Sequence, residues 1–299
     1  MRTGMNQPEP EHLVSGLVVG NQTLRNIRGN MKELNIGIVT PLALQSLPIE
    51  FHLSYIANVN YIQANASKLP FKIKQIRMIA PHTFPIDANR NECIAYIKKW
   101  DIDISLWMDA DQDFMNTADE NKPNVLFNLL KDGYEYPIYA GIYYLKKPPY
   151  YPIVFQANED FDVFSPIWLY EPDELFYADM IGMGCCKIDR SIINQLDHPY
   201  FKYNSIPKAL ATNETARFKF DNHIEDVSED VAFWKQVKEK TGKRIVVDPR
   251  IQVGHVSKFT VTQRVFQSHV DINKEMAQEE LGEKFDEYWS KICRAEPVK

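Results

Sequence analysis

Short apolar runs and amphipathic stretches alternate over residues 35–131, and this alternation predicts alternating strands and helices. Runs of four to eight apolar and β-branched residues are typical of buried strands, whereas an apolar residue every three to four positions is typical of a packed helix. The pattern predicts strands at 35–40, 74–80 and 104–108, helices at 51–64 and 89–100, and a further helix at 123–131. This order of elements favours parallel strands joined by right-handed crossovers.

The pattern is less regular beyond residue 131. Apolar runs at 138–145 and 151–155 flank two prolines and predict a hairpin or neighbouring strands. The stretch 156–172 is polar, aromatic and irregular, as surface binding loops often are. Further elements are predicted as a helix at 229–240, a last strand at 244–247 and a helical tail at 271–294. We expect one α/β domain over 34–260, with an appendage at 1–33 before it and the helical tail region, 261–299, after it.

The composition fits a large α/β enzyme. The chain has 299 residues with 44% hydrophobic content, which is enough apolar material for one large core. The formal charge of −6 argues against binding nucleic acid through a broad basic surface. The four cysteines show no C-x-x-C spacing, so we expect reduced thiols. The sequence lacks a long apolar run and a secretory signal pattern, and we therefore expect no transmembrane segment and a cytoplasmic location.

Three aspartates stand at alternate positions directly behind the predicted strand 104–108: Asp109, Asp111 and Asp113. The carboxyl ends of parallel strands form the edge at which open α/β sheets bind ligands. Closely spaced carboxylates repel one another unless a cation lies between them, and oxygen ligands of this kind suit Mg²⁺ or Mn²⁺. The D-x-D motif, Asp109-Ala110-Asp111, is short and has many chance matches, so a polar turn after a strand is the alternative.

Three further polar segments lie far from the aspartates in the sequence: Gly182-Met183-Gly184, Ser228-Glu229-Asp230 and Val253-Gly254-His255. Each has a purely structural alternative. The glycines could make a tight turn or allow close packing. Ser228 could cap the predicted helix while the two acids complement its dipole. A lone histidine after a strand is more often a hydrogen-bonded structural residue than a ligand.

In this order and with these gaps, the D-x-D motif and the three segments resemble the glycosyltransferase-A fold enzymes, particularly the inverting family-2-like group with many bacterial and viral members. The resemblance covers roughly residues 35–258. It implies a single Rossmann-like domain with a central, mostly parallel sheet flanked by helices, and a nucleotide-diphosphate sugar as the donor substrate. Many relatives carry glycine immediately before the Glu-Asp pair, where this chain has Ser228, and the acceptor class therefore stays open.

The resemblance also implies which residues bind the nucleotide sugar. Thr40 and Pro41 match the nucleotide-contacting end of the first strand. Arg90 matches the arginine that approaches the diphosphate, although it could equally be a solvated residue at a helix start. Gly182 and Gly184 match a segment that lines the donor sugar.

The same resemblance implies a set of metal ligands. Asp109 would help to hold the ribose or the metal, and Asp111 would coordinate the metal that bridges the diphosphate. His255 would supply a further ligand to Mn²⁺ or Mg²⁺. Asp113 could replace or supplement one of these ligands.

On the acceptor side, Glu229 and Asp230 match the acidic pair of the family, and Asp230 would be the general base. A base held at hydrogen-bond distance from the acceptor hydroxyl contributes about 10²- to 10⁴-fold to the rate. The positive end of the helix dipole would lower the pKa of Asp230 and keep this carboxylate ionised.

Together these residues predict a metal-dependent, inverting glycosyltransferase that moves a sugar from a nucleotide-diphosphate donor to a hydroxyl acceptor. A glycan, a lipid-linked sugar, a protein or a modified DNA base could be the acceptor, with the negative net charge weighing against DNA. Two alternatives stay open. One is a nucleotidyl or phosphoryl transferase with paired aspartates and divalent metal, although no G-x-x-x-x-G-K-[ST] loop occurs. The other is a non-catalytic nucleotide-sugar or carbohydrate-binding module.

Overall fold

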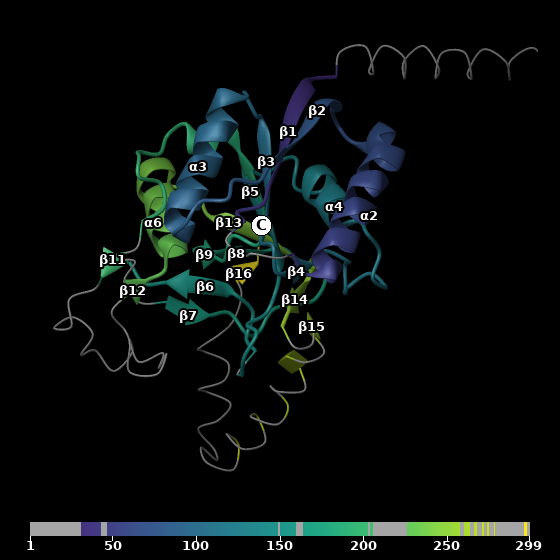
Figure 1. Ribbon diagram of the computed structural model, residues 1–299. Coiled ribbons are helices and arrows are strands. Elements are labelled where there is room, and N and C mark those ends of the chain that lie inside the picture. Colours follow the sequence, from purple (N-terminus) through teal and green to yellow (C-terminus); the bar gives the residue numbers. More distant parts are fainter. Residues whose placement is uncertain are drawn as a thin grey trace, which may run out of the picture.

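The protein is built around one eight-stranded sheet, as a computed structural model shows (Figure 1). The structure describes residues 31–42, 47–148, 150–159, 164–202, 204–205, 226–257, 260–263, 266–267, 271, 274, 278 and 296–297. The strand order is β16-β8-β13-β5-β10-β3-β1-β2. Its strands are β1 (Glu33–Val39), β2 (Lys72–Ile79), β3 (Ile104–Met108), β5 (Ile138–Ile142), β8 (Phe176–Ala178), β10 (Cys185–Asp189), β13 (Ile245–Gln252) and β16 (Glu296–Pro297).

Six of the eight strands run in one direction, and only β8 and β10 oppose them. Strand β1 pairs in parallel with both β2 and β3, and β13 pairs in parallel with β5. Strand β10 is antiparallel to its neighbours β3 and β5, and β8 is antiparallel to β13 and β16. The expected mostly parallel, Rossmann-like α/β sheet is therefore confirmed. The carboxyl ends of the parallel strands lie at one edge of the sheet.

Helices cover both faces of this sheet and give it two hydrophobic cores (Figure 1). The helices are α2 (Ile49–Asn65), α3 (Ile86–Lys99), α4 (Val125–Lys131), α5 (Arg190–Ile193) and α6 (Glu229–Thr241), with a 3-10 turn, η1, at Ala66–Lys68. Helices α3, α5 and α6 pack on one face, and α2 and α4 pack on the other. The strands alternate accordingly, because successive side chains of a strand point to opposite faces. In β3, Trp107 enters the first core and Leu106 the second.

Three small sheets extend the main one. Strands β4 (Gln112–Asp113), β14 (Gly254–Val256) and β15 (Thr260–Val261) form the first. Strands β6 (Val154–Ala157), β7 (Phe164–Pro166) and β9 (Met180–Ile181) form the second, and β11 (Asn204–Ser205) pairs with β12 (Asp226–Val227). In the first small sheet His255 lies opposite Gln112, so the chain after the last long strand returns to the D-x-D segment.

The elements predicted up to residue 131 are confirmed, with ends that shift by at most three residues. Two predictions were wrong. The strand expected at 244–247 continues to Gln252 as β13 and is followed by β14. The stretch 156–172 is not wholly irregular, because it contains the end of β6 and all of β7.

Some predictions are not tested. The appendage at 1–33 and the tail at 271–294 lie largely outside the described residues, although positions 271, 274 and 278 are helical. The domain boundaries at 33/34 and 260/261 stay predictions. Across the described ranges, every helix is too short or too polar to cross a lipid bilayer.

Candidate active site

One buried arginine joins the D-x-D motif to the acidic pair. Arg90, on the first half of α3, is 4% exposed. Its Nη1 donates to Glu229 Oε1 at 2.7 Å and to Asp230 Oδ1, and its Nη2 donates to Asp109 Oδ1 at 3.2 Å. The structure thus brings together four of the predicted site residues from three distant parts of the sequence. Arg90 is not the solvated helix-start residue of the alternative interpretation.

The charges of this cluster explain why arginine occupies its centre. Burial opposes the charge of Arg90, but the three carboxylates around it outweigh burial and raise its pKa. Its planar guanidinium offers several donors and can bind several carboxylates at once. The guanidinium carbon also lies 5.7 Å from the centre of the Phe201 ring. A buried arginine without these partners would carry a large desolvation cost.

Asp230 has a raised pKa, so the expectation that the helix dipole lowers it was wrong. Burial raises the pKa of Asp230 to about 7, and the neighbouring charges of Glu229 and Asp109 act in the same direction while Arg90 opposes them. The backbone N–H of Met183 also donates to this carboxylate. A carboxylate with a pKa close to neutral pH suits a general base better than one with an ordinary pKa.

Ser228 caps the N-terminus of α6, as the alternative interpretation of this segment predicted. The hydroxyl oxygen of Ser228 accepts a hydrogen bond from the backbone N–H of Asp230 at 3.3 Å. The carboxyl groups of Glu229 and Asp230 instead turn to Arg90. Capping by Ser228 therefore leaves both acids available to the site.

Asp111 belongs to a second charged group at the same edge of the sheet. Its Oδ2 forms an ion pair with Lys146, and its Oδ1 lies 3.6 Å from His255 Nε2. Burial alone would raise the pKa of Asp111, but hydrogen bonds and charge from His255 and Lys146 outweigh it and lower the pKa to about 2. Asp111 is therefore ionised at neutral pH.

His255 is oriented as a metal-binding histidine is. Its Nδ1 lies 2.7 Å from the carbonyl oxygen of Tyr144. Because a carbonyl only accepts hydrogen bonds, Nδ1 carries a proton, and Nε2 is the ring nitrogen that faces Asp111. A histidine ligand commonly donates its other N–H to a carbonyl or carboxylate in this way.

The chemistry of these donors fits a divalent cation. Asp109, Asp111 and His255 offer two carboxylates and an imidazole, which suit Mn²⁺ and are accepted by Mg²⁺. As the side chains stand, Asp109 contacts Arg90 and Asp111 contacts Lys146. Within the ranges that the structure describes, there is no place where three side chains of His, Cys, Asp or Glu lie close enough together to bind one metal ion. Binding of a cation by these residues stays a prediction.

The two glycines allow close packing beside Asp109. A Cβ on Gly184 would lie 2.1 Å from Gln112 Nε2 and 2.9 Å from Asp109 Oδ2, and a Cβ on Gly182 would lie 1.8 Å from the Tyr143 hydroxyl. The Gly184 N–H also donates to that hydroxyl at 3.2 Å. The structural alternative for these glycines therefore holds, and their contact with a donor sugar stays a prediction.

Thr40 and Pro41 lie at the same edge, at the carboxyl end of β1. The Thr40 N–H donates to the Ile79 carbonyl at 2.8 Å, and the side chain of Thr40 is fully buried. Within the described part of the chain its hydroxyl oxygen has no hydrogen-bond partner. The Asn89 side chain donates to the carbonyls of Pro81 and Thr83, each at 3.0 Å, and so fixes the segment after β2. Contact of Thr40 and Pro41 with a nucleotide is not tested.

Asp113 does not join this group. Its Oδ1 accepts a hydrogen bond from the Met115 N–H at 3.1 Å. Burial raises its pKa, Glu50 adds to the rise, and a hydrogen bond with Ser54 opposes it. Because Glu50 and Ser54 belong to α2, Asp113 lies near that helix. Its suggested role as a metal ligand is not tested.

Sequence reasoning missed three site residues, Lys146, Gln112 and Tyr143. Gln112 is fully buried, and neither its amide nitrogen nor its amide oxygen has a hydrogen-bond partner among the residues that the structure describes. The pKa of Tyr143 is raised far above its usual range by burial and by the charges of Asp109 and Asp230. Only Gln112 carried a sequence signal, since it stands inside the run of alternate aspartates.

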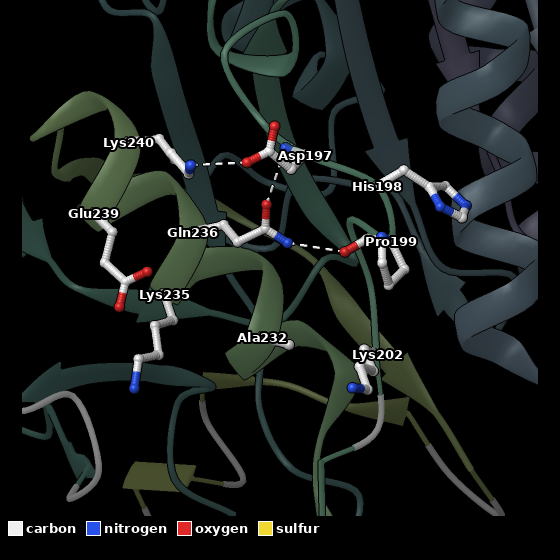
Figure 2. A pocket seen from close by; sticks show the side chains of 9 residues that line it. All are labelled: Asp197, His198, Pro199, Lys202, Ala232, Lys235, Gln236, Glu239 and Lys240. Atoms are coloured by element: carbon white, nitrogen blue, oxygen red, sulfur yellow. Dashed lines mark hydrogen bonds and ion pairs between the residues drawn. The ribbon is translucent and has the colours of Figure 1, made fainter.

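A pocket of about 380 Å³ lies on the outer side of α6 (Figure 2). Its lining residues are Asp197, His198, Pro199, Lys202, Ala232, Lys235, Gln236, Glu239 and Lys240. Within it Lys240 Nζ lies 2.7 Å from Asp197 Oδ2, and Gln236 donates to the Pro199 carbonyl. None of the Arg90 or Asp111 partners lines this pocket, so the pocket is separate from the candidate active site at the sheet edge.

No protein-family model and no curated protein sequence matches this chain. Among solved structures, A197 from STIV is 15% identical with a TM-score of 0.43, over 75% of this chain and 86% of that chain. Apo UDP-glucose pyrophosphorylase is 10% identical with a TM-score of 0.32, over 87% of each chain. A glycosyltransferase involved in glycosylation of the major capsid of PBCV-1 is 13% identical with a TM-score of 0.24, over 55% of this chain and 68% of that chain. Likenesses at this level do not indicate an activity.

Proposed function

We propose that this protein is a metal-dependent, inverting glycosyltransferase that uses a nucleotide-diphosphate sugar. The observation that carries the proposal is the buried contact of Arg90 with Asp109 on one side and with Glu229 and Asp230 on the other. It joins a candidate donor site, the D-x-D motif, to a carboxylate with a pKa of about 7. Transfer between two substrates needs both groups next to one another.

Asp109, Asp111 and His255 would hold Mn²⁺ or Mg²⁺ on the donor side. The bound ion would act as a Lewis acid for the diphosphate leaving group. Arg90 contacts Asp109 and would contribute positive charge at the same place. Thr40 and Pro41, at the end of β1, would contact the nucleotide.

Asp230 would act on the acceptor as general base. The acceptor hydroxyl gives its proton to a carboxylate oxygen of Asp230 while its oxygen forms a bond to the anomeric carbon. The bond between that carbon and the diphosphate oxygen breaks, and the electron pair leaves with the diphosphate. Attack from the face opposite the leaving group inverts the anomeric configuration. Glu229 would act as a positioning residue, because it holds Arg90 at 2.7 Å.

The test is the product formed from a panel of sugar nucleotides in the presence of Mn²⁺. Release of a nucleoside diphosphate, lost in Asp111→Asn, supports sugar transfer. Release of pyrophosphate from a nucleoside triphosphate and a sugar phosphate would instead identify a nucleotidyltransferase. The third outcome is that a sugar nucleotide binds but is not turned over, whether or not a glycan, a lipid-linked sugar or a protein is added as acceptor. That result would identify a binding module.

A further inference from the structure

Lys146 occupies one side of the carboxylate that the proposed function assigns to the metal. It lies in the segment that follows β5, two residues after the bridge between Tyr144 and Pro152. Its ammonium group forms an ion pair with Asp111 Oδ2, and the two side chains are 35% and 29% exposed. The resemblance to the glycosyltransferase-A fold enzymes implies no role for this lysine.

Both oxygens of Asp111 are engaged, one by Lys146 and the other by His255. A divalent cation that binds Asp111 has to replace at least one of these partners. His255 can stay, because its Nε2 is itself a metal ligand when Nδ1–H is held by the Tyr144 carbonyl. Lys146 cannot ligate a cation while it is protonated, and its charge repels one. Lys146 is therefore the partner that has to leave.

Lys146 can leave at a lower cost than Arg90. Arg90 is 4% exposed and shared among three carboxylates, so moving it would leave buried charges unpaired. Lys146 is partly exposed on a flexible side chain and contacts one carboxylate of the site. A nucleotide diphosphate that arrives with the cation offers new negative charge to this freed ammonium group.

We propose that Lys146 is a displaceable counter-ion. It neutralises Asp111 in the free protein, gives way to the divalent cation, and then binds the diphosphate of the donor. The inference rests on the proposed function. It predicts that removal of Lys146 strengthens cation binding and weakens diphosphate binding.

The test uses Lys146→Met in the full-length protein. Calorimetry with Mn²⁺ alone should show tighter binding than in the parent, by about 3- to 10-fold, since a partly exposed charge pair of modest strength is removed. With saturating Mn²⁺, uridine or guanosine diphosphate should bind about 3- to 10-fold more weakly, because a charge-assisted contact is lost. Lys146→Arg should keep most of the diphosphate affinity.

Lys147→Met is the matched control, because it removes an exposed positive charge from the next residue of the same segment. It should change both affinities by less than the Lys146 variant does. A Lys146→Met protein that unfolds like the parent but binds both ligands more weakly, or binds both unchanged, overturns the inference alone. A parent that binds neither Mn²⁺ nor a nucleoside diphosphate overturns the proposed function and the inference with it.

Discussion

Replacement of Asp230 by asparagine separates its proposed catalytic role from its effect on stability. Asparagine has nearly the same shape but cannot accept the acceptor proton as a carboxylate does. Turnover should fall by roughly 10²-fold or more, the contribution typical of a general base. Binding of the nucleoside diphosphate should change little, since the carboxylate acts on the acceptor. In the parent, turnover should rise with pH up to about 7 and then level off, because only the ionised carboxylate accepts a proton.

The same substitution should stabilise the fold, in a pH-dependent way. The pKa of Asp230 rises from 3.8 to about 7 in the folded protein, mainly through burial. The folded state therefore binds a proton more tightly than the unfolded chain, and ionisation destabilises the fold as the pH rises through this window. One pKa unit corresponds to about 1.4 kcal/mol, so the full rise corresponds to at most about 4 kcal/mol. Loss of one partner of Arg90 reduces this gain.

Urea unfolding of parent and Asp230→Asn at pH 4 and pH 8 measures this effect. We expect the variant to gain about 1 to 4 kcal/mol at pH 8 and almost nothing at pH 4, together with the loss of turnover. Asp113→Asn is the matched control, because Asp113 lies near α2, and it should keep the parental rate. Parental turnover in Asp230→Asn, or an equal change in stability at both pH values, would refute the assignment and leave helix capping by Ser228 as the function of this segment.

Three other predictions concern the donor side and the geometry of transfer. Asp111→Asn should remove the dependence of nucleoside diphosphate binding on Mn²⁺, and His255→Ala should weaken Mn²⁺ binding less, as calorimetry with and without a chelator would show. Gly184→Ala should lower the free energy of unfolding by about 1–3 kcal/mol through overpacking, because the new Cβ would lie 2.1 Å from the Gln112 amide nitrogen. Adding Gln112→Ala to this variant should recover part of that loss. The product should have the opposite anomeric configuration to the donor by NMR, and a retained configuration would contradict direct in-line attack.

The part of the fold predicted best from the sequence is the part with the simplest local pattern. The run Ile104–Met108 is wholly apolar apart from one serine, and it forms β3 with the predicted ends. The strand predicted at 244–247 was placed too short because Asp248, Pro249 and Arg250 interrupt the apolar pattern. Tertiary contacts compensate, since Asp248 accepts a hydrogen bond from Tyr139 at 2.6 Å and pairs with Arg250. A local pattern cannot show the contact with Tyr139, which lies 109 residues away in the sequence.

In the candidate site, too, some residues could be predicted from the local sequence and others could not. The carboxylates could be predicted because ligand sites lie at the carboxyl ends of parallel strands, and Asp109 and Asp111 follow such a strand directly. The pKa of Asp230 could not be predicted, because the helix dipole is a local effect, whereas burial and the charges of Glu229 and Asp109 depend on the folded structure. Lys146 could not be assigned either, since nothing in its neighbouring residues indicates that it lies against Asp111. Gln112 stands between two aspartates, but its position in the sequence does not show that its side chain lies beside Gly184. The basic residues that neutralise the carboxylates of this site can therefore be identified only in the folded protein. Long-range contacts decide which lysine or arginine forms an ion pair with each carboxylate.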